Sequence, residues 1–167
     1  MDVTDAKIDP EIMRLAMRNW ATGVTIVTSS SNGIQHGMTV SSFTSVSIDP
    51  AMVLVSLQDN ARTHRLVKES GIFAVTILDQ GQVAISDRFA GRQTENLNRF
   101  RGLDTFTMVT GAPLVRGGLV SFDCQVCDTH DIGQHTLFIG QVLAMQKGDG
   151  VQPLIYFDRR YHKIIKS

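Results

Sequence analysis

The feature that most constrains the fold is a series of short apolar runs, rich in β-branched residues and separated by turn signals. Ser31-Asn32-Gly33 is a strong hairpin signal, and Asp49-Pro50 marks a second turn. The predicted strands cover residues 24–28, a partner starting near 34, 52–57, 72–78, 119–128, 135–145 and 154–158, with 161–164 continuing the last one. Six or seven strands at hairpin spacing, without repeated βαβ units, predict a mainly β, antiparallel barrel with two or three flanking helices.

The sequence predicts four helical stretches, two of which have clear end signals. Asp9 and Pro10 are a good N-cap and first helical residue, and apolar residues then recur at helical spacing. Asp59 or Asn60 is expected to cap a second helix that stops at Gly71. The predicted helices cover residues 10–21, the stretch after 60 through 69, 80–89 and, within a polar excursion from 91 to 118, residues 94–100.

Length and charge narrow the function classes. A chain of 167 residues is expected to form one domain, residues 1–167, with its own core. Lys+Arg and Asp+Glu both number 16, so no net positive charge points to a nucleic acid or to a membrane surface. No apolar run approaches the ~20 residues that cross a bilayer, and the N-terminus lacks a secretory pattern. We therefore expect a cytoplasmic location.

Cys124 and Cys127 are spaced as a CxxC pair, which is typical of zinc sites and redox disulfides. The run around them alternates like a strand, so the two side chains would point to opposite faces, with Cα atoms about 10 Å apart. No second CxxC or ligand-spaced pair of histidines completes a metal site. The sequence therefore predicts structural cysteines and no metal.

A run dense in hydroxyl groups, HGMTVSSFTSVSIDP, covers residues 36–50 between two predicted strands. Small hydroxyl side chains let a ligand approach the backbone closely and offer it several hydrogen-bond donors. The run suits a phosphate or a heterocycle rich in acceptors. A solvent-facing strand rich in Ser and Thr is the alternative.

Several segments, in order, resemble the flavin reductase-like family, the small NAD(P)H:flavin oxidoreductases with an FMN-binding split β-barrel. The segments that carry the resemblance are NWATGVTIVT (19–28), GMTVSSFTSVSIDP (37–50), MVLVSL (52–57), ESGIFAVTIL (69–78), TGAPLVRGGLVSFDC (110–124), GQHTLFIGQV (133–142) and PLIYFDRRYH (153–162). The chain has no GxGxxG motif and no length for a separate dinucleotide domain, so a nicotinamide would dock directly on a bound flavin.

The resemblance implies a reductase that transfers hydride from NADH or NADPH to FMN or FAD. It also implies a homodimer, and release of reduced flavin to a flavin-dependent monooxygenase. The alternative is a split-barrel protein that binds flavin or haem without reducing flavin, because a fold does not fix its chemistry. An enzyme of the pyridoxamine-phosphate-oxidase type fits the order of the motifs less well.

The resemblance also implies which residues hold the flavin. The isoalloxazine would be cradled by backbone and side-chain groups of Thr39, Val40, Ser41, Ser42, Ser47, Ser56, Leu57 and Gln58. The phosphate would lie at the start of the second helix, near Asn60, Ala61, Arg62 and Thr63, because free N–H groups and the helix dipole favour an anion there. Ala61 replaces a serine common in relatives, and Arg62 has a solvated surface cation as its alternative interpretation.

His135 is the expected catalytic residue, because it matches a family histidine near the reactive face of the flavin. Gln134 stands where the family usually has Asp, so no carboxylate-oriented proton relay is assumed, and hydride transfer depends mainly on stacking and distance. Residues that match the family's phosphate, adenylate or nicotinamide regions are Phe89, Arg92, Arg99 and Tyr161. Core packing, surface charge or edge packing is the alternative for each of these. No role follows from the spacing of the other histidines, His36, His64, His130 and His162.

Overall fold

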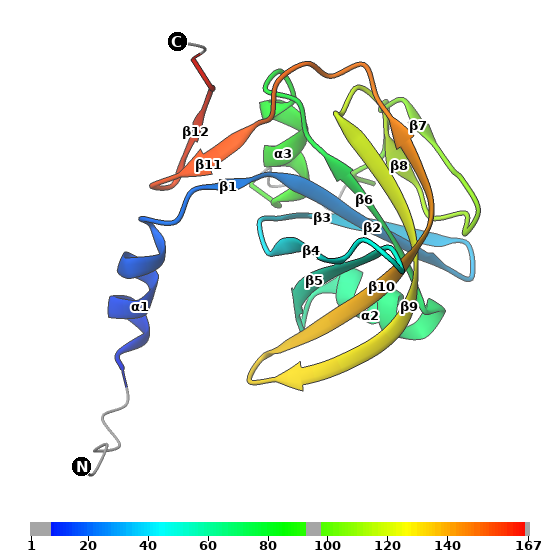
Figure 1. Ribbon diagram of the computed structural model, residues 1–167, viewed down its shortest axis with the longest axis horizontal. Coiled ribbons are helices and arrows are strands. Elements are labelled where there is room, and N and C mark those ends of the chain that lie inside the picture. The colour runs from blue at the N-terminus through cyan, green and yellow to red at the C-terminus, as the bar shows by residue number, and fades with distance from the viewer. Residues whose placement is uncertain (1–7, 93–97, 166–167) are drawn as a thin grey trace.

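The computed structural model describes residues 8–92 and 98–165, and its main element is a seven-stranded antiparallel sheet in the order β3-β2-β6-β9-β10-β5-β4 (Figure 1). The strands of this sheet are β2 Thr25–Ser31, β3 Ile34–Val40, β4 Phe43–Ser47, β5 Met52–Gln58, β6 Ile72–Ile77, β9 Val120–Ile132 and β10 His135–Lys147. The predicted antiparallel β architecture is confirmed. The β9–β10 hairpin is longer than predicted, because its ladder continues to a tight turn at Gly133.

The sheet must curl into a barrel because of the link between β3 and β4. These strands lie at opposite ends of the strand order, yet only Ser41 and Ser42 separate them along the chain. A two-residue link spans roughly 10 Å at most, so the two edges of the sheet come together at this point. We call this junction the seam. The hydroxyl-rich run at 36–50 therefore passes through the seam.

Two smaller sheets flank the barrel. β1 (Thr22–Gly23), β11 (Ile155–Phe157) and β12 (Arg160–His162) form one, and β7 (Thr105–Phe106) pairs with β8 (Leu114–Val115) in the other. The prediction that residues 161–164 continue the last strand is wrong. The chain reverses at Asp158 and Arg159, which both have positive φ angles of 47° and 61°, and β12 runs back along β11.

Three helices occur in the described ranges: α1 (Pro10–Met17), α2 (Arg62–Ser70) and α3 (Val83–Phe89). α1 ends four residues earlier than predicted, because the side-chain amide of Asn19 donates to carbonyls of the last turn. α3 begins at Val83 rather than residue 80, because the carboxylate of Asp79 accepts from Gly81 N and holds a turn there.

α2 differs from the prediction at its start. Its N-cap is Ala61, not Asp59 or Asn60, and no side chain caps its first amides. Its end is confirmed, since Gly71 is the C-cap with a left-handed φ of 68°. Most of the short helix predicted over residues 94–100 lies outside the described residues, and residues 98–100 form a turn and not a helix.

Two apolar clusters make up most of the core. The barrel interior is filled from β2, β5, β6, β10 and α2, with Phe73, Phe138 and Leu57 among its largest fully buried side chains. The second cluster packs α3 against β1–β2 and the C-terminal strands, with Phe89 at its centre. Phe89 meets Phe100 edge-on, with ring centroids 5.2 Å apart, so core packing accounts for part of the Phe89 side chain.

The CxxC cysteines point to opposite faces of β9, as predicted. Cys124 is buried in the barrel core, Cys127 is exposed, and neither is in a disulfide. Burial and, second, Asp123 raise the pKa of Cys124 to about 12, so its thiol is inert packing. In the described ranges no three His, Cys, Asp or Glu side chains gather to hold a metal, and no helix is long and apolar enough to cross a bilayer.

Candidate active site

The seam places hydroxyl groups from β3 and the β3–β4 link beside α3. Thr39 Oγ1 donates to the carbonyl of Ser86 at 2.6 Å, which fixes the end of β3 against α3. Across the link, Ser42 and Ser56 exchange two hydrogen bonds, Ser56 N to Ser42 O at 3.1 Å and Ser42 Oγ to Ser56 O at 2.7 Å. Of the predicted cradle residues, Thr39 therefore contacts α3, whereas Ser42 and Ser56 contact each other between the β3–β4 link and β5.

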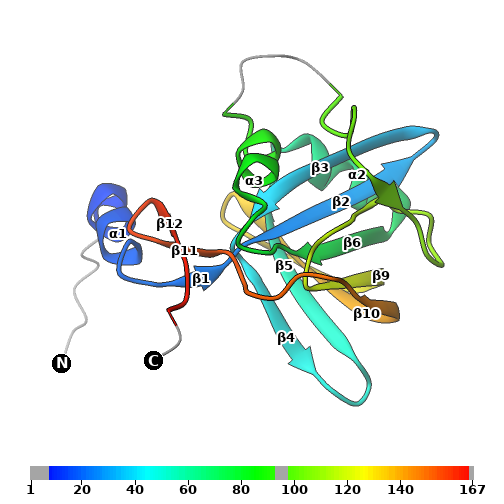
Figure 2. The ribbon, with the colours of Figure 1, turned by 90° about the horizontal axis from the view of Figure 1, so that it is seen from above.

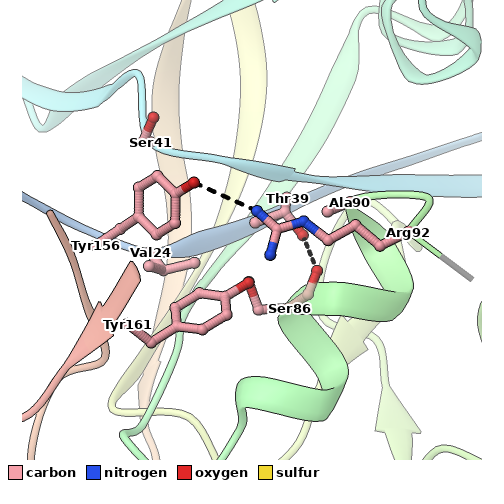
Figure 3. A pocket seen from close by; sticks show the side chains of 8 residues that line it. All are labelled: Val24, Thr39, Ser41, Ser86, Ala90, Arg92, Tyr156 and Tyr161. Atoms are coloured by element: carbon pink, nitrogen blue, oxygen red, sulfur yellow. Dashed lines mark hydrogen bonds between the residues drawn. The ribbon is translucent and has the colours of Figure 1, made fainter. Parts of the chain in front are cut away.

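A cavity of about 180 Å³ opens at the seam between β3, α3 and the β11–β12 hairpin (Figure 3). We call it the tyrosine cavity. The residues that line it are Val24, Thr39, Ser41, Ser86, Ala90, Arg92, Tyr156 and Tyr161. It brings together four predicted site residues, Thr39, Ser41, Arg92 and Tyr161, from three distant parts of the chain.

Arg92 is held in this cavity by groups on three sides. Its guanidinium donates to Asp87 Oδ1 at 2.9 Å and to the Tyr156 hydroxyl at 3.3 Å. Figure 3 shows the contact with Tyr156 as a dashed line. Its Cζ also lies 5.8 Å from the ring centroid of Tyr161. The Tyr161 hydroxyl is 2.9 Å from both Asp87 Oδ1 and Ser86 Oγ, and burial is the main cause that raises its pKa. The arrangement presents a cation and two aromatic rings to the cavity.

A second cavity of about 350 Å³ adjoins the first and shares Thr39 and Ala90 with it. We call it the arginine cavity. The residues that line it are His36, Met38, Thr39, Ala61, Arg62, Thr63, Phe89, Ala90 and Arg99. Ala61, Arg62 and Thr63, which were predicted to lie near the phosphate, all line this one cavity. Phe89 and Arg99, which were predicted to line the phosphate or adenylate region, line it as well.

Arg99 and His36 give the arginine cavity its electrostatic character. Arg99 Nη1 donates to the carbonyls of Gly37 and Phe89, at 2.8 Å each, so the guanidinium is fixed on the backbone of β3 and α3. His36 Nδ1 is 2.8 Å from Thr63 Oγ1. Burial, then Arg99, then Arg62 lower the pKa of His36 to about 4, so the ring is neutral at pH 7 beside two cations.

The remaining predicted residues line neither cavity. The side chains of Val40 and Leu57 are buried in the barrel core, which leaves only their backbone groups for a ligand. Ser47 pairs with Met52 at the far end of the β4–β5 hairpin. Ser42 lies in the seam itself, and Ser56, Gln58 and Asn60 lie along β5 and the turn that leads to α2.

His135 is the first residue of β10 and is exposed. It pairs with Gln58 on β5 and with Ile132 on β9, and the neighbouring Gln134 carbonyl accepts from Asp59 N at 3.0 Å. It therefore sits at the α2-proximal edge of the barrel, beside predicted cradle residue Gln58. It lines neither the tyrosine cavity nor the arginine cavity.

Several residues that line or shape the cavities were not predicted from the sequence. Tyr156 could have been found from Tyr161, because the two are paired across the β11–β12 hairpin. Ser86 and Asp87 carry no local signal, since they reach the site only through the packing of α3. His36 is the first residue of the hydroxyl-rich run at 36–50, but its role depends on a contact with α2.

A family model described as flavin reductase like domain matches residues 17–164. The chain belongs to this family. It is 36% identical to an NADH-dependent flavin reductase from a Rhodococcus species, an alignment that covers 98% of this chain and 94% of the relative. The membership predicted from the sequence is confirmed.

Solved structures agree with this membership. The flavin reductase PheA2 in its native state matches with a TM-score of 0.87 and 35% identity, over 95% of this chain and 100% of that chain. The styrene monooxygenase flavin reductase SMOB from Pseudomonas putida S12 matches with a TM-score of 0.82 and 35% identity, over 93% of this chain and 98% of that chain. The fold of this family member is thus the split barrel of flavin reductases.

Proposed function

We propose that the protein is an NADH-dependent flavin reductase, which transfers hydride from the nicotinamide to FMN or FAD. The observation that carries the proposal is the pair of adjoining cavities at the seam, one aromatic and one lined by two arginines, in a chain of this family. The arginine cavity suits the phosphate of a flavin, and the tyrosine cavity suits a nicotinamide that stacks on the flavin ring. The residues present therefore fit the group.

In this proposal the arginine cavity holds the phosphate. Arg62 and Arg99 supply cationic donors, and the uncapped amides at the start of α2 add donors aimed at an anion. Ala61 contributes no hydroxyl, so the helix amides face the ligand without competition from a side-chain cap. A bound flavin would supply the hydride acceptor; the protein supplies binding and orientation.

The seam residues would hold and orient the ring system. Backbone groups of residues 39–42 and 56–58 offer alternating donors and acceptors to its polar edge. Tyr161 and Arg92 would form one wall of the nicotinamide site, because an aromatic ring and a guanidinium both stack on a flat heterocycle. His135 is proposed to contact the reacting pair, where hydride transfer requires close stacking more than proton transfer.

The test follows NADH and NADPH oxidation at 340 nm by the purified protein, with and without added FMN or FAD, beside its visible spectrum. The expected result is oxidation that depends on added flavin and far exceeds the background with free flavin. The same series chooses between NADH and NADPH and between FMN and FAD. A yellow protein that oxidises neither nicotinamide would overturn the proposal and favour a flavin-binding protein without reductase activity.

We further propose that the reduced flavin passes to a flavin-dependent monooxygenase. The support is the resemblance to the flavin reductase of styrene monooxygenase. In an aerobic mixture with a flavin-dependent monooxygenase, its substrate and flavin, the protein and NADH should yield oxygenated product. Replacing the protein with photochemically reduced flavin is the control, and product formation only with the protein itself would point to a direct complex instead of free diffusion.

We also propose a homodimer in which α1 packs on a second copy of the chain. Both views of the ribbon show α1 beside β11 and β12 and apart from the barrel (Figures 1 and 2), and none of its residues is buried. Ile12, Leu15 and Trp20 are 62%, 54% and 67% exposed. Light scattering coupled to gel filtration should give twice the chain mass. The double variant I12D/L15D should give a monomer, whereas Arg14→Ala on the same helix should not.

A further inference from the structure

His36 occupies an unusual electrostatic position at the wall of the arginine cavity. The residue lies on β3, and its Nδ1 is 2.8 Å from the hydroxyl of Thr63 on α2. Burial, then Arg99 and Arg62, lower the pKa of its ring. On the neighbouring strand β2 its partner is Ser29, which carries no charge. The charged groups that face it from the described elements are thus two cations, and the free protein keeps the ring neutral.

Thr63 makes this position more specific. Its side chain is fully buried, and His36 Nδ1 is the partner of its hydroxyl, yet the residue lines the arginine cavity. In either neutral tautomer of His36 one ring nitrogen lacks a proton and can only accept. A phosphate presents acceptors only, so a neutral ring offers it one donor at most. The site is therefore built for an anion but is one proton short of its full set of donors.

We propose that His36 is a specificity residue for phosphorylated flavins: when the flavin phosphate enters the arginine cavity, the His36 imidazole takes up one proton from solvent. This inference rests on the proposed function, because it assigns the phosphate of that ligand to this cavity. It predicts that preference for FMN over riboflavin, which lacks the phosphate, grows as the pH falls.

The charges of the site carry the proposal. Burial and, second, the two guanidinium groups keep the ring neutral in the free protein. An arriving dianion offsets the charge of the guanidinium groups and adds an attractive partner for an imidazolium. The proton converts the acceptor nitrogen of the ring into a donor. With Nδ1–H donating to Thr63 Oγ1, the Thr63 hydroxyl hydrogen becomes free to donate to the ligand. One proton gained thus adds one donor, because either neutral tautomer leaves only Nε2–H or the Thr63 hydroxyl free, whereas the imidazolium leaves both to donate to the phosphate.

Calorimetric titration of FMN into the protein measures the proton directly, when it is repeated near pH 7.2 in buffers of different ionisation enthalpy without phosphate. The matched variant is His36→Asn, whose side chain reaches Thr63 from the position of Nδ1 but cannot take up a proton. The phosphate has its own pKa near 6 and contributes equally to both proteins. The expected difference between wild type and variant approaches one proton per FMN bound.

A second readout compares the dissociation constants of FMN and riboflavin between pH 6.5 and pH 8. In the wild type their ratio should rise by up to tenfold for each unit of pH lowered. In H36N the ratio should stay flat. The same net proton uptake in both proteins, or equal affinity for FMN and riboflavin at every pH, would overturn the role of His36 while leaving reductase activity intact. Failure to bind or reduce either flavin overturns the proposed function as well.

Discussion

The Tyr161 hydroxyl and Asp87 Oδ1 lie 2.9 Å apart, and the same carboxylate oxygen accepts from Arg92, also at 2.9 Å. One acidic residue on α3 thus fixes an aromatic ring from the C-terminal hairpin and a cation from the following loop. Tyr161→Ala should raise the KM for NADH by more than tenfold, because it removes the wall itself. Tyr161→Phe keeps the ring and loses a hydrogen bond, so a rise of about two- to tenfold is expected.

Steady-state kinetics with NADH varied at saturating flavin would check this prediction. Stopped-flow reduction of bound flavin separates binding from the hydride step. Equal KM values in Tyr161→Ala and the wild type would show that the ring does not contact the nicotinamide, and would leave edge packing as its role.

His135 should matter by contact and not by proton transfer. The variant His135→Ala is expected to lower kcat/KM for NADH by about tenfold or more, because hydride transfer depends steeply on how the reactants are placed. His135→Asn, which restores a polar side chain of similar reach, should recover much of this loss at all pH values. His130→Ala is the matched control, because His130 is exposed on the same hairpin and contacts Asp128. Equal losses in H130A and H135A would indicate a general effect on the hairpin.

Ala61 offers a separate test of the start of α2. The N-cap position lacks a side-chain hydrogen bond, so Ala61→Ser should stabilise the protein by about 0.5–1 kcal/mol in urea denaturation. Ala61→Asp should also cap the helix, but its negative charge would lie on the arginine cavity and weaken FMN binding. If A61D stabilised the protein and bound FMN as well as A61S does, the phosphate would have to lie elsewhere.

Asp123 is the buried anchor of the long excursion after α3. Its carboxylate is fully buried on β9 and accepts from both the backbone N–H, at 2.7 Å, and the hydroxyl of Thr110. Asp123→Ala should cost about 2–4 kcal/mol of unfolding free energy, because it leaves a donor of Thr110 without a partner. Thr110→Val removes only the hydroxyl, so a loss of about 1 kcal/mol is expected. Equal losses would mean that the backbone contact contributes nothing.

The predictable parts of the fold are those with a local cause. The turn at Asn32–Gly33 and the C-cap at Gly71 have backbone conformations that few other residues adopt, so the residue types alone locate them. The reversal at Asp158 and Arg159 was not predictable in this way. Both residues have positive φ angles, but neither is a glycine or asparagine. The pairing of β12 with β11 and the contacts of Asp158 with Arg18, which lies far away in the sequence, hold them there. The single domain over residues 1–167 stays a prediction.

The candidate site likewise contains residues that a local pattern identifies and residues that only distant contacts bring to it. The residues of the run at 37–50 and of the start of α2 are close in sequence to strand ends, so a family resemblance could place them. The position of Ser86 in the site and the pairing of His36 with Thr63 depend on contacts between elements that are far apart along the chain. No local pattern contains such contacts, because they arise only when the barrel curls and α3 packs against it.

Asp79 gives the protein a predictable sensitivity to acid. Its carboxylate accepts from the backbone N–H groups of Gly81, Val151 and Gln152, at 2.8, 2.9 and 3.1 Å, and ties the start of α3 to the loop before β11. These backbone hydrogen bonds, Gly81 first, lower the pKa of Asp79 below its ordinary value. The carboxylate therefore stabilises the folded state fully above the unfolded pKa of about 3.9, and this contribution is lost as the pH falls through the lower folded pKa.

Asp79→Asn should therefore reduce stability at pH 7 and show a smaller further loss below pH 4 than the wild type. Urea denaturation at a series of pH values from 7 to 2.5 measures both the loss of stability at pH 7 and the further loss below pH 4. The difference in unfolding free energy between the two proteins should narrow as the pH falls below 4, because protonation removes from the wild type what the mutation has already removed. If that difference stayed constant down to pH 2.5, the effect of the mutation would come from packing in the 79–82 turn and not from the charge.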